Sequence, residues 1–299
     1  MAYRTTITIP ELCDKQLNIW SNPIFMQAVA RLTNREALHL KCYKGEELIA
    51  ILPLYENKLL GYRALVSPSM SYYQALNLWL PDNINPSRHL LESLHVSQLI
   101  AETIITRYKR VHFNLGTDFY DVRSFTWAGL KAKPLYTFIS DLTGNEKTLA
   151  DESKKMTRAL KLGYTFAQDF RPKEFIQLSK ELHDKKGINL GVSFTKLESF
   201  VTQLHEAGLL RQYNVYDGKN IVSSNILLSA NDGKAYTVLL ATNATAMKQG
   251  VSTLHSLKLI ESLRNEFKLL DFCGANVQDV ARFKAALGLQ LRVFYQIHT

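Results

Sequence analysis

A row of basic residues between positions 154 and 161 could bind phosphate groups. Lys155, Arg158 and Lys161 recur at a spacing of three, so in a helix they share one face, and Lys154 lies near the same face. A guanidinium contacts phosphate oxygens with two-pronged geometry, and nearby ammonium groups add positive charge, so this row can hold a diphosphate. The alternative is a solvated helix face that binds nothing.

A second stretch that could do chemistry follows an apolar strand ending at Asp271. Gly274 breaks this strand, and a short helix then carries Phe283 and Lys284 until Gly288 ends it. Gly274 suits a sharp turn in which the backbone comes close to another group. Lys284 lies one turn before the helix end, where a cation complements the helix dipole. By themselves these residues predict a strand, a turn, a helix and a final strand, and none of the carboxylates is marked as a general base.

The composition of the 299-residue chain, with 46% hydrophobic and 21% charged residues, is typical of a globular protein with sizeable cores. Its net charge of +9 is unevenly placed. Residues 147–186 hold ten Lys or Arg against six Asp or Glu, an excess of +4, and residues 248–299 hold seven against four, an excess of +3. This excess favours an anionic ligand such as a nucleotide, a phosphorylated cofactor, RNA or a phospholipid precursor.

The sequence argues against several classes of protein. It has no apolar run near the roughly 18 residues of a membrane span, and its N-terminus lacks an apolar secretory core. Cys13, Cys42 and Cys273 are odd in number and widely separated, which fits reduced thiols. Cys and His residues do not cluster with zinc spacing, and no Gly-x-Ser-x-Gly elbow, Walker loop or dinucleotide fingerprint is present. We therefore expect a cytoplasmic protein without a metal site.

The two halves of the chain repeat the same order of expected elements. The hairpin segment 43–48 aligns without a gap with 216–221, which lies 173 residues later. In each half a helix precedes the hairpin, and a strand, a helix and an apolar strand follow it. This order predicts two α+β domains in tandem, residues 1–133 and 134–299.

Specific motifs resemble those of a known family. The pattern Asp-Phe-x-Gly, followed by Phe-Lys-x-x-Leu-Gly up to Gly288, resembles the closing motif of Fem-type peptidyltransferases and their GNAT-like acyltransferase relatives. The segment 140–163 is similar to the Fem inter-domain segment, in which a strand ending in Asp-Leu-Ser/Thr leads into a basic helix. The resemblance implies an α+β fold of two tandem GNAT-like domains (the acyl-CoA N-acyltransferase fold) with a cleft between them.

The resemblance also implies roles for individual residues. It assigns Lys284 the stabilisation of an oxyanion and Phe283 the ordering of the donor end. In GNAT relatives a Gln/Arg-x-x-Gly-x-Gly/Ala loop at a helix start cradles the donor pyrophosphate, although Met247 here replaces the first residue. The implied donor contacts are Lys248, Gln249, Gly250, Ser252 and Gly274. The implied acceptor or phosphate contacts are Lys154, Lys155, Arg158, Lys161 and, in a Ser-Pro-rich loop, Tyr72, Tyr73 and Gln74.

These features predict an N-acyltransferase that moves an acyl or aminoacyl group from an activated donor to an amine acceptor. Acyl-CoA and aminoacyl-tRNA are both open as co-substrates, and no permanently bound cofactor is expected. The lack of the long helical hairpin found in some Fem enzymes, together with the small size, favours a small acyl donor. The alternative is a non-catalytic relative that binds an anionic nucleotide or an envelope precursor.

Overall fold

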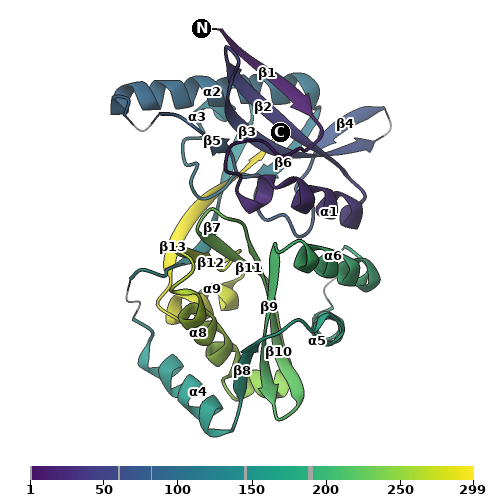
Figure 1. The fold of residues 1–299 in the computed structure, drawn as a ribbon, viewed down its shortest axis with the longest axis vertical. Coiled ribbons are helices and arrows are strands. Elements are labelled where there is room, and N and C mark those ends of the chain that lie inside the picture. Colours follow the sequence, from purple (N-terminus) through teal and green to yellow (C-terminus); the bar gives the residue numbers. More distant parts are fainter. Residues whose placement is uncertain (1, 60, 82, 145–146, 188–190) are drawn as a thin grey trace. The chain divides into compact units, whose positions relative to one another are not determined.

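The computed structural model describes residues 2–59, 61–81, 83–144, 147–187 and 191–299. The chain forms two compact units, unit 1 with residues Met1–Leu135 and Val293–Thr299, and unit 2 with residues Tyr136–Arg292. Each unit contains a mixed sheet with helices packed on it (Figure 1).

The first element of unit 1 is an edge strand, and its last helix is short. Its elements are β1 (Tyr3–Thr8), a 3₁₀ turn η1 (Ile19–Ser21), α1 (Pro23–Thr33), β2 (Glu36–Lys44), β3 (Glu47–Leu59), β4 (Tyr62–Leu65), β5 (Asn77–Leu78), α2 (Pro86–Arg107), β6 (Arg110–Asn114) and α3 (Arg123–Trp127).

Unit 2 begins within a strand that leaves unit 1. Its elements are β7 (Lys131–Asp141), α4 (Ala150–Lys161), β8 (Thr165–Gln168), α5 (Pro172–Lys186), α6 (Phe194–Glu206), β9 (Leu210–Asp217), β10 (Asn220–Ser229), β11 (Lys234–Thr242), α7 (Ala244–Lys248), α8 (Val251–Leu263), β12 (Leu269–Asp271) and α9 (Gln278–Ala286). The last strand, β13 (Gln290–His298), starts in unit 2 and continues into unit 1.

Asn and Ser residues set several of the helix starts. The Asn22 side chain accepts hydrogen bonds from the backbone N–H groups of Ile24 and Phe25, and a proline follows it at the first position of α1. Asn85 and a following proline begin α2 in the same way. These caps satisfy backbone donors that the helix itself leaves unpaired.

The strand order of the two units is the same. Unit 1 has the order β1-β2-β3-β4-β6-β13, and unit 2 has the order β8-β9-β10-β11-β12-β7. In both, the first three pairings are antiparallel, the fourth is parallel and the last is antiparallel. The crossover helix between the parallel strands is α2 in unit 1 and α8 in unit 2. The tandem repeat of an α+β fold that the sequence predicts is therefore confirmed, whereas a cleft between the repeats stays a prediction.

The compact units differ from the expected domain ranges at the C-terminal strand. The sequence places all of β13 in the second domain, but its last residues belong to unit 1. The cause is strand pairing, because Gln296, Ile297 and His298 pair antiparallel with Asn114, Phe113 and His112 of β6. Ile297 is fully buried in the unit 1 core.

The core of unit 1 lies between its sheet and α2. Leu38, Leu40 and Cys42 of β2 point to this side and pack with Val96 and Ile100 of α2. The alternate β2 residues point to the opposite face, as the two-residue period of a strand requires. That face lies on the side of η1 and α1, whose large side chains are buried.

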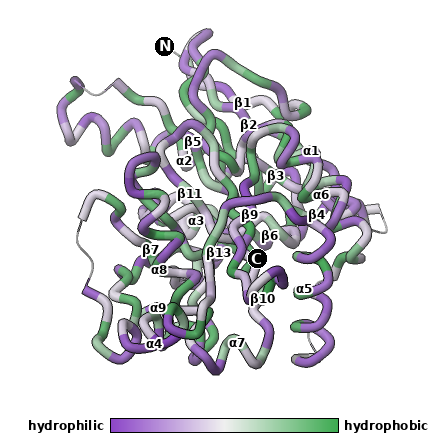
Figure 2. Tube along the Cα trace, turned by 60° about the horizontal axis from the view of Figure 1, so that its bottom comes forward, coloured by the Kyte–Doolittle hydropathy of each residue, from purple (hydrophilic) through white to green (hydrophobic). Residues whose placement is uncertain are grey.

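The sheet of unit 2 is also covered on both faces. Leu259, Ile260 and Leu263 of α8 pack against Leu227 and Leu270 on one face. On the other face α5 packs on β10 and β11. Figure 2 shows α5 as mostly hydrophilic, with its buried apolar residues forming a narrow stripe, as expected for a surface helix.

Gly250 permits a close approach between α4 and α8. It has φ +91°, and a methyl group there would lie 2.6 Å from the carbonyl oxygen of Lys155. We expect Gly250→Ala to lower the free energy of unfolding by about 1–2 kcal/mol for the left-handed backbone, plus about 1–3 kcal/mol for overpacking. Gly208→Ala is the control, since Gly208 has φ +71° and open space around it. If chemical denaturation gives the same loss of free energy of unfolding for both variants, the contact between Gly250 and the Lys155 backbone is not tight.

Candidate functional site

The parallel strands of unit 2 separate after a short ladder. β11 and β12 pair at three positions, from Lys234 with Leu269 to Tyr236 with Asp271. β11 then continues to Thr242, while the chain beyond Asp271 turns away. The parallel ladder therefore stops at Tyr236 and Asp271, at the carboxyl ends of its described pairings. We call this place the fork of unit 2.

Lys284 closes the turn at the base of this fork. Its Nζ donates to the backbone carbonyl oxygens of Phe272 at 2.6 Å and Cys273 at 3.0 Å, and also to that of Gly274. The carbonyls can converge because Cys273 and Gly274 both have positive φ, 41° and 76°. Since an ammonium has three donors, all of them are engaged here. We call residues 272–274 with the Lys284 ammonium the carbonyl cradle.

The Asp271 side chain stabilises the backbone turn of the carbonyl cradle. Its carboxylate accepts hydrogen bonds from the Thr137 hydroxyl at 2.6 Å and from the backbone N–H of Cys273 at 2.8 Å. Asp271 is buried, with 4% of its surface exposed, so these bonds replace the water that the charge has lost. The sequence placed Asp271 at the end of a strand, but nothing marked Thr137, which lies 134 positions away.

Burial changes the acid–base properties of the cradle. Loss of water lowers the pKa of Lys284 to about 8, although the nearby Cys273 and Asp271 act in the opposite direction. Burial also raises the pKa of the Cys273 thiol well above its ordinary range, with a smaller contribution from Asp271. Cys273 therefore stays a neutral thiol.

Phe283 precedes Lys284 on α9, but its side chain packs against the apolar core of unit 2. It is partly buried against the apolar core that contains Phe272 and Leu287. Its side chain therefore helps to anchor α9, and through α9 the position of Lys284. The roles of Phe283 and Lys284 towards a donor stay predictions.

The start of α8, where the sequence predicts a pyrophosphate cradle, is covered by α4. The backbone of Lys155 lies against Gly250, and Val251 and Leu254 are fully buried. Glu152, also buried, accepts a hydrogen bond at 2.6 Å from the hydroxyl of Thr253 in the first turn of α8. A carboxylate near the N-terminal end of a helix is favoured by the helix dipole, so the protein already supplies an anion where a pyrophosphate would bind.

The remaining predicted donor contacts have different surroundings. The Gln249 side chain accepts a hydrogen bond from the Tyr164 hydroxyl. Lys248 is exposed, and Ser252 is partly buried. Gly274 lies in the carbonyl cradle instead, so the predicted donor residues are divided between the start of α8 and the fork.

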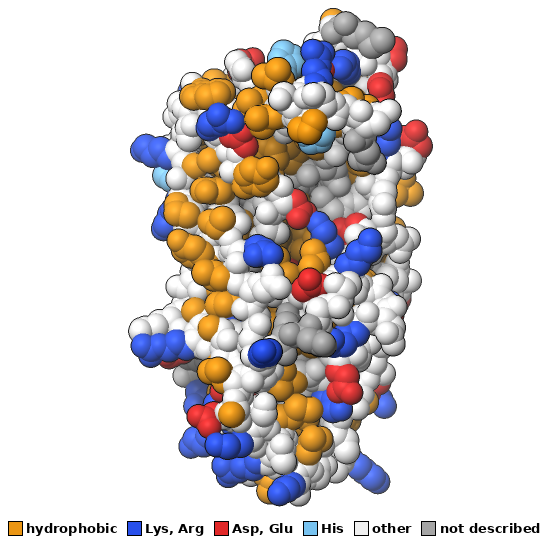
Figure 3. Space-filling view, turned by 90° about the vertical axis from the view of Figure 1, so that its left-hand side faces the viewer, with side chains coloured by type: hydrophobic (Ala, Val, Ile, Leu, Met, Phe, Trp, Pro, Cys, Tyr) orange, Lys and Arg blue, Asp and Glu red, His pale blue; other side chains and the backbone are white. Residues whose placement is uncertain are grey.

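The basic residues of α4 are on its exposed surface. Lys154 pairs with Asp151 at 3.2 Å and Lys155 with Glu152 at 2.6 Å. Arg158 and Lys161 have no acidic partner among the described residues. A depression on the same surface is lined by Ser153, Lys154, Thr157, Arg158, Lys161 and Leu162. Figure 3 shows Lys and Arg side chains gathered in the lower part of this side of unit 2, where α4 lies. Lys154, Arg158 and Lys161 line this depression together, whereas Lys155 is not part of its lining, and the bound phosphate stays a prediction.

The predicted acceptor residues of unit 1 are mostly buried. Tyr73 is 1% exposed and packs edge-on against Trp20 and Phe294. Gln74 is fully buried, and its Oε1 accepts from the backbone N–H of Asn114 at 3.1 Å. Tyr72 is partly buried, and its carbonyl accepts from the Asn114 amide.

These contacts fill the fork of unit 1. In the described pairings, β4 and β6 pair at Ala64 with Arg110 and at Leu65 with Val111, one position fewer than the parallel strands of unit 2. Beyond this ladder the loop 67–75 returns against β6, and the backbone N–H of Gln74 donates to Asn114. The two forks therefore differ, because the fork of unit 1 is occupied by its own loop.

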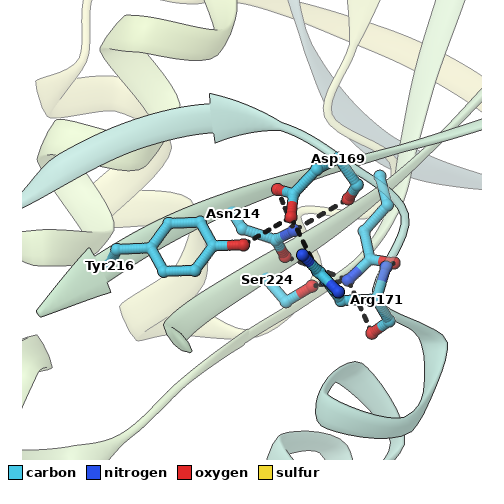
Figure 4. Close-up of polar contacts among 6 residues, drawn as sticks. Asp169, Arg171, Asn214, Tyr216 and Ser224 are labelled. Atoms are coloured by element: carbon cyan, nitrogen blue, oxygen red, sulfur yellow. Dashed lines mark hydrogen bonds and ion pairs between the residues drawn. The ribbon is translucent and has the colours of Figure 1, made fainter. Parts of the chain in front are cut away.

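Sequence reasoning missed a polar network around Asp169 in unit 2. Asp169, after β8, accepts from Tyr216, Asn214 and Arg171 (Figure 4). These bonds hold the pKa of Asp169 below its ordinary value, although partial burial acts against them. Every carboxylate oxygen is engaged, so the network fixes the corner between β8 and α5. The spacing of polar residues on β9 is the only sequence signal for it.

The described residues lack two kinds of feature. They contain no group of His, Cys, Asp and Glu side chains that could hold a metal ion. Among the helices of this described part, none has both the length and the apolar character needed to cross a membrane.

Comparison with known proteins identifies the fold. No protein-family model matches the chain, and no curated protein is similar in sequence. The crystal structure of FemX superposes with a TM-score of 0.66 and 14% identity, covering 92% of this chain and 90% of that one. The C-terminal domain of a protein described as a lysylphosphatidylglycerol synthetase from Agrobacterium fabrum gives 0.60 and 13%, covering 92% and 87%. L-PGS from Bacillus licheniformis gives 0.57 and 13%, covering 91% and 86%. The FemX-like, GNAT-type fold that the motifs predict is thus confirmed.

The lowered pKa of Lys284 predicts a pH-dependent stability. Between about pH 8 and the unfolded lysine pKa of about 10.4, the unfolded state binds more protons, so stability rises with pH in this window. We expect the free energy of unfolding of the wild type to rise relative to Lys284→Met by up to about 1.4 kcal/mol per pH unit. Chemical denaturation from pH 7 to 10 measures this difference. If the difference in free energy of unfolding between the wild type and Lys284→Met does not change from pH 7 to 10, the hydrogen bonds to the carbonyl oxygens fully offset the loss of water around the ammonium.

Proposed function

We propose that this protein is an N-acyltransferase whose donor binds in the fork of unit 2. The observation that carries the proposal is the carbonyl cradle, which places a buried ammonium beside the open end of the parallel ladder. The fold likeness to FemX and to lysylphosphatidylglycerol synthetases supports an acyl or aminoacyl transfer. The fork of unit 1 is a poorer candidate, because its own loop occupies it.

The reaction needs charge stabilisation more than a new covalent partner. An amine nitrogen attacks the donor carbonyl, the C–N bond forms, and the C–O or C–S bond to the leaving group breaks. The amine proton passes to the leaving group. Negative charge develops on the carbonyl oxygen in between, and a positioned ammonium in a water-poor site stabilises it strongly. Lys284 would exchange one of its three carbonyl partners for this oxygen, which couples catalysis to a small movement of residues 272–274.

The closed start of α8 favours an aminoacyl ester over acyl-CoA. Coenzyme A binding at a helix start requires free backbone N–H groups for its pyrophosphate. Here the Lys155 backbone and the buried Glu152 carboxylate cover that position. An ester linked to RNA does not require this cradle, and its phosphates would meet Arg158 and Lys161 on the exposed face of α4. This proposal departs from the small acyl donor that the size of the chain favours.

A non-catalytic binder of an anionic nucleotide or precursor is the second candidate. The observation in its favour is that the donors of Lys284 are all satisfied by backbone, so the lysine also has a complete structural role. The basic face of α4 would serve such a binder equally well. Turnover measurements on variants of the cradle separate the two.

Lys284→Met tests catalysis. If the ammonium stabilises the oxyanion, the single-turnover rate with an aminoacyl ester donor should fall by about 10²–10³, with little change in donor affinity. The variant should also be less stable, because three carbonyls lose their donor.

A matched control removes the effect of stability. Leu204→Ala on α6 opens a cavity at a fully buried position in the same unit without touching the cradle. Its rate per folded molecule should equal that of the wild type. If Lys284→Met keeps the wild-type rate as well, the catalytic role is wrong and the binder is favoured.

Arg158→Glu tests the proposed contact with RNA. Reversing this charge should weaken the binding of unacylated tRNA and lower the salt dependence of binding, with a slope smaller by at least about 1. Lys196→Glu, an exposed change of equal charge on α6, is the control and should alter both quantities less. Equal effects of the two variants in a fluorescence titration would return the α4 face to an ordinary solvated surface.

A further inference from the structure

Unit 1 contains a buried lysine whose counter-ion comes from an irregular segment. Lys41 of β2 is 5% exposed, and its Nζ forms an ion pair with the carboxylate of Glu11. Glu11 lies in residues 9–18, which connect β1 to η1 without a regular helix or strand and which we call the strap. The Glu11 side chain is 57% exposed, so the carboxylate reaches the buried ammonium from the outside.

The Lys41 ammonium has capacity that the described residues do not use. A lysine presents three donors, and Glu11 is its one described partner. A buried ammonium without an anion is strongly unfavourable, so some oxyanion has to occupy this position. The contact with Lys41 accordingly lowers the pKa of Glu11.

A second unfilled polar atom lies on the same face of β2. His39 is two residues before Lys41, so both side chains leave the strand on one side. Its Nε2 lies 3.0 Å from the Ser21 carbonyl oxygen, which can only accept, so Nε2 carries the proton. Burial lowers the pKa of His39 to about 4, and the neutral ring leaves a lone pair on Nδ1. That atom is buried and has no hydrogen-bond partner among the described residues.

The strap has backbone contacts at its ends, and its middle has side-chain contacts that include an ion pair of Lys15 with Glu47 at 3.8 Å. It leaves β1 after Thr8, which pairs with His39, and the backbone N–H of Asn18 donates to the Asn77 side chain at 3.0 Å. Between these points Ile9 and Leu12 are 73% and 74% exposed. Ile9 and Leu12 therefore bury little apolar surface, although Pro10 is buried, and opening this part of the strap costs less than opening a core strand.

We propose that Lys41 and His39 form a binding site for a small oxyanion, which Glu11 fills when no ligand is bound. The ligand is a carboxylate or a phosphate whose oxygen takes the place of the Glu11 carboxylate on Lys41. A hydroxyl next to the anionic group would donate to His39 Nδ1. Ligand binding then releases the strap, and the tethered carboxylate sets the affinity that a ligand must exceed. This site is independent of the cradle in unit 2.

Glu11→Gln exposes the site to added anions. In chloride buffer the variant should melt several degrees below the wild type, and acetate, glycolate and phosphate should restore its melting temperature in a saturable manner, at matched ionic strength. The wild type should respond far less, because its own carboxylate competes. Glu46→Gln, which removes an exposed partner of Arg4 in the same unit, is the control and should show no saturable response.

The comparison of the three anions identifies the class of ligand, and further variants test the contacts with His39 and Lys41. Glycolate restoring more stability than acetate supports the contact with His39, and His39→Phe should remove that preference. If only phosphate restores the melting temperature of Glu11→Gln, the ligand is a phosphate. If acetate restores it, the ligand is a carboxylate. Glu11→Gln/Lys41→Met should be stable without any anion and should not respond. If Glu11→Gln does not fold, adding acetate during refolding should recover it.

Two results would overturn the proposal. One is a Glu11→Gln protein whose response to all three anions equals its response to chloride, whether in melting or in refolding. The other is an unchanged anion response after Lys41→Met is added, which would place the bound anion elsewhere.

Discussion

The ammonium of Lys284 and the three carbonyl oxygens around it organise the candidate site. Two successive residues with positive φ are unfavourable for a chain, and Cys273 is not a glycine, so the turn needs a partner that rewards this conformation. The ammonium supplies it, and Asp271 supplies the complementary bond to the backbone N–H of Cys273. The turn ends the parallel ladder and so creates the fork. The charge proposed for catalysis and the structural clamp are thus the same group, and the interactions that stabilise the turn also position this charge.

The contact between α4 and α8 gives the protein its second defining constraint. A helix start is a general site for anions, and many folds leave it open for a phosphate. Here Glu152 occupies that environment, and the close approach of Lys155 to Gly250 leaves no room beside it. The same helix turns its basic residues outward. A buried anion on one face and exposed cations on the other therefore move the attraction for phosphate from the start of α8 to the surface of α4.

Local patterns predicted the elements well, and long-range contacts explain what they could not. The aligned segments 43–48 and 216–221 predicted the β2–β3 and β9–β10 hairpins, and the repeated order of elements around them predicted the tandem repeat. The sequence could not show that Glu152 meets Thr253, or that the loop with Tyr73 and Gln74 folds back on β6. Polar and aromatic residues have the same local signature whether they bind a ligand or a neighbouring loop. For Lys284 the sequence predicted the position, but the carbonyl partners depend on backbone angles that only the fold determines.

The path of β13 has a consequence for how the chain acquires its structure. Residues 293–299 complete the sheet of unit 1 beside β6, yet they follow the whole of unit 2 along the chain. During synthesis β6 therefore remains an open edge with unpaired backbone groups until unit 2 has been made, and such edges are prone to pair with other chains. Unit 1 is the first to be translated and the last to be finished. Its early partly folded form is the species for which assistance from chaperones would matter most.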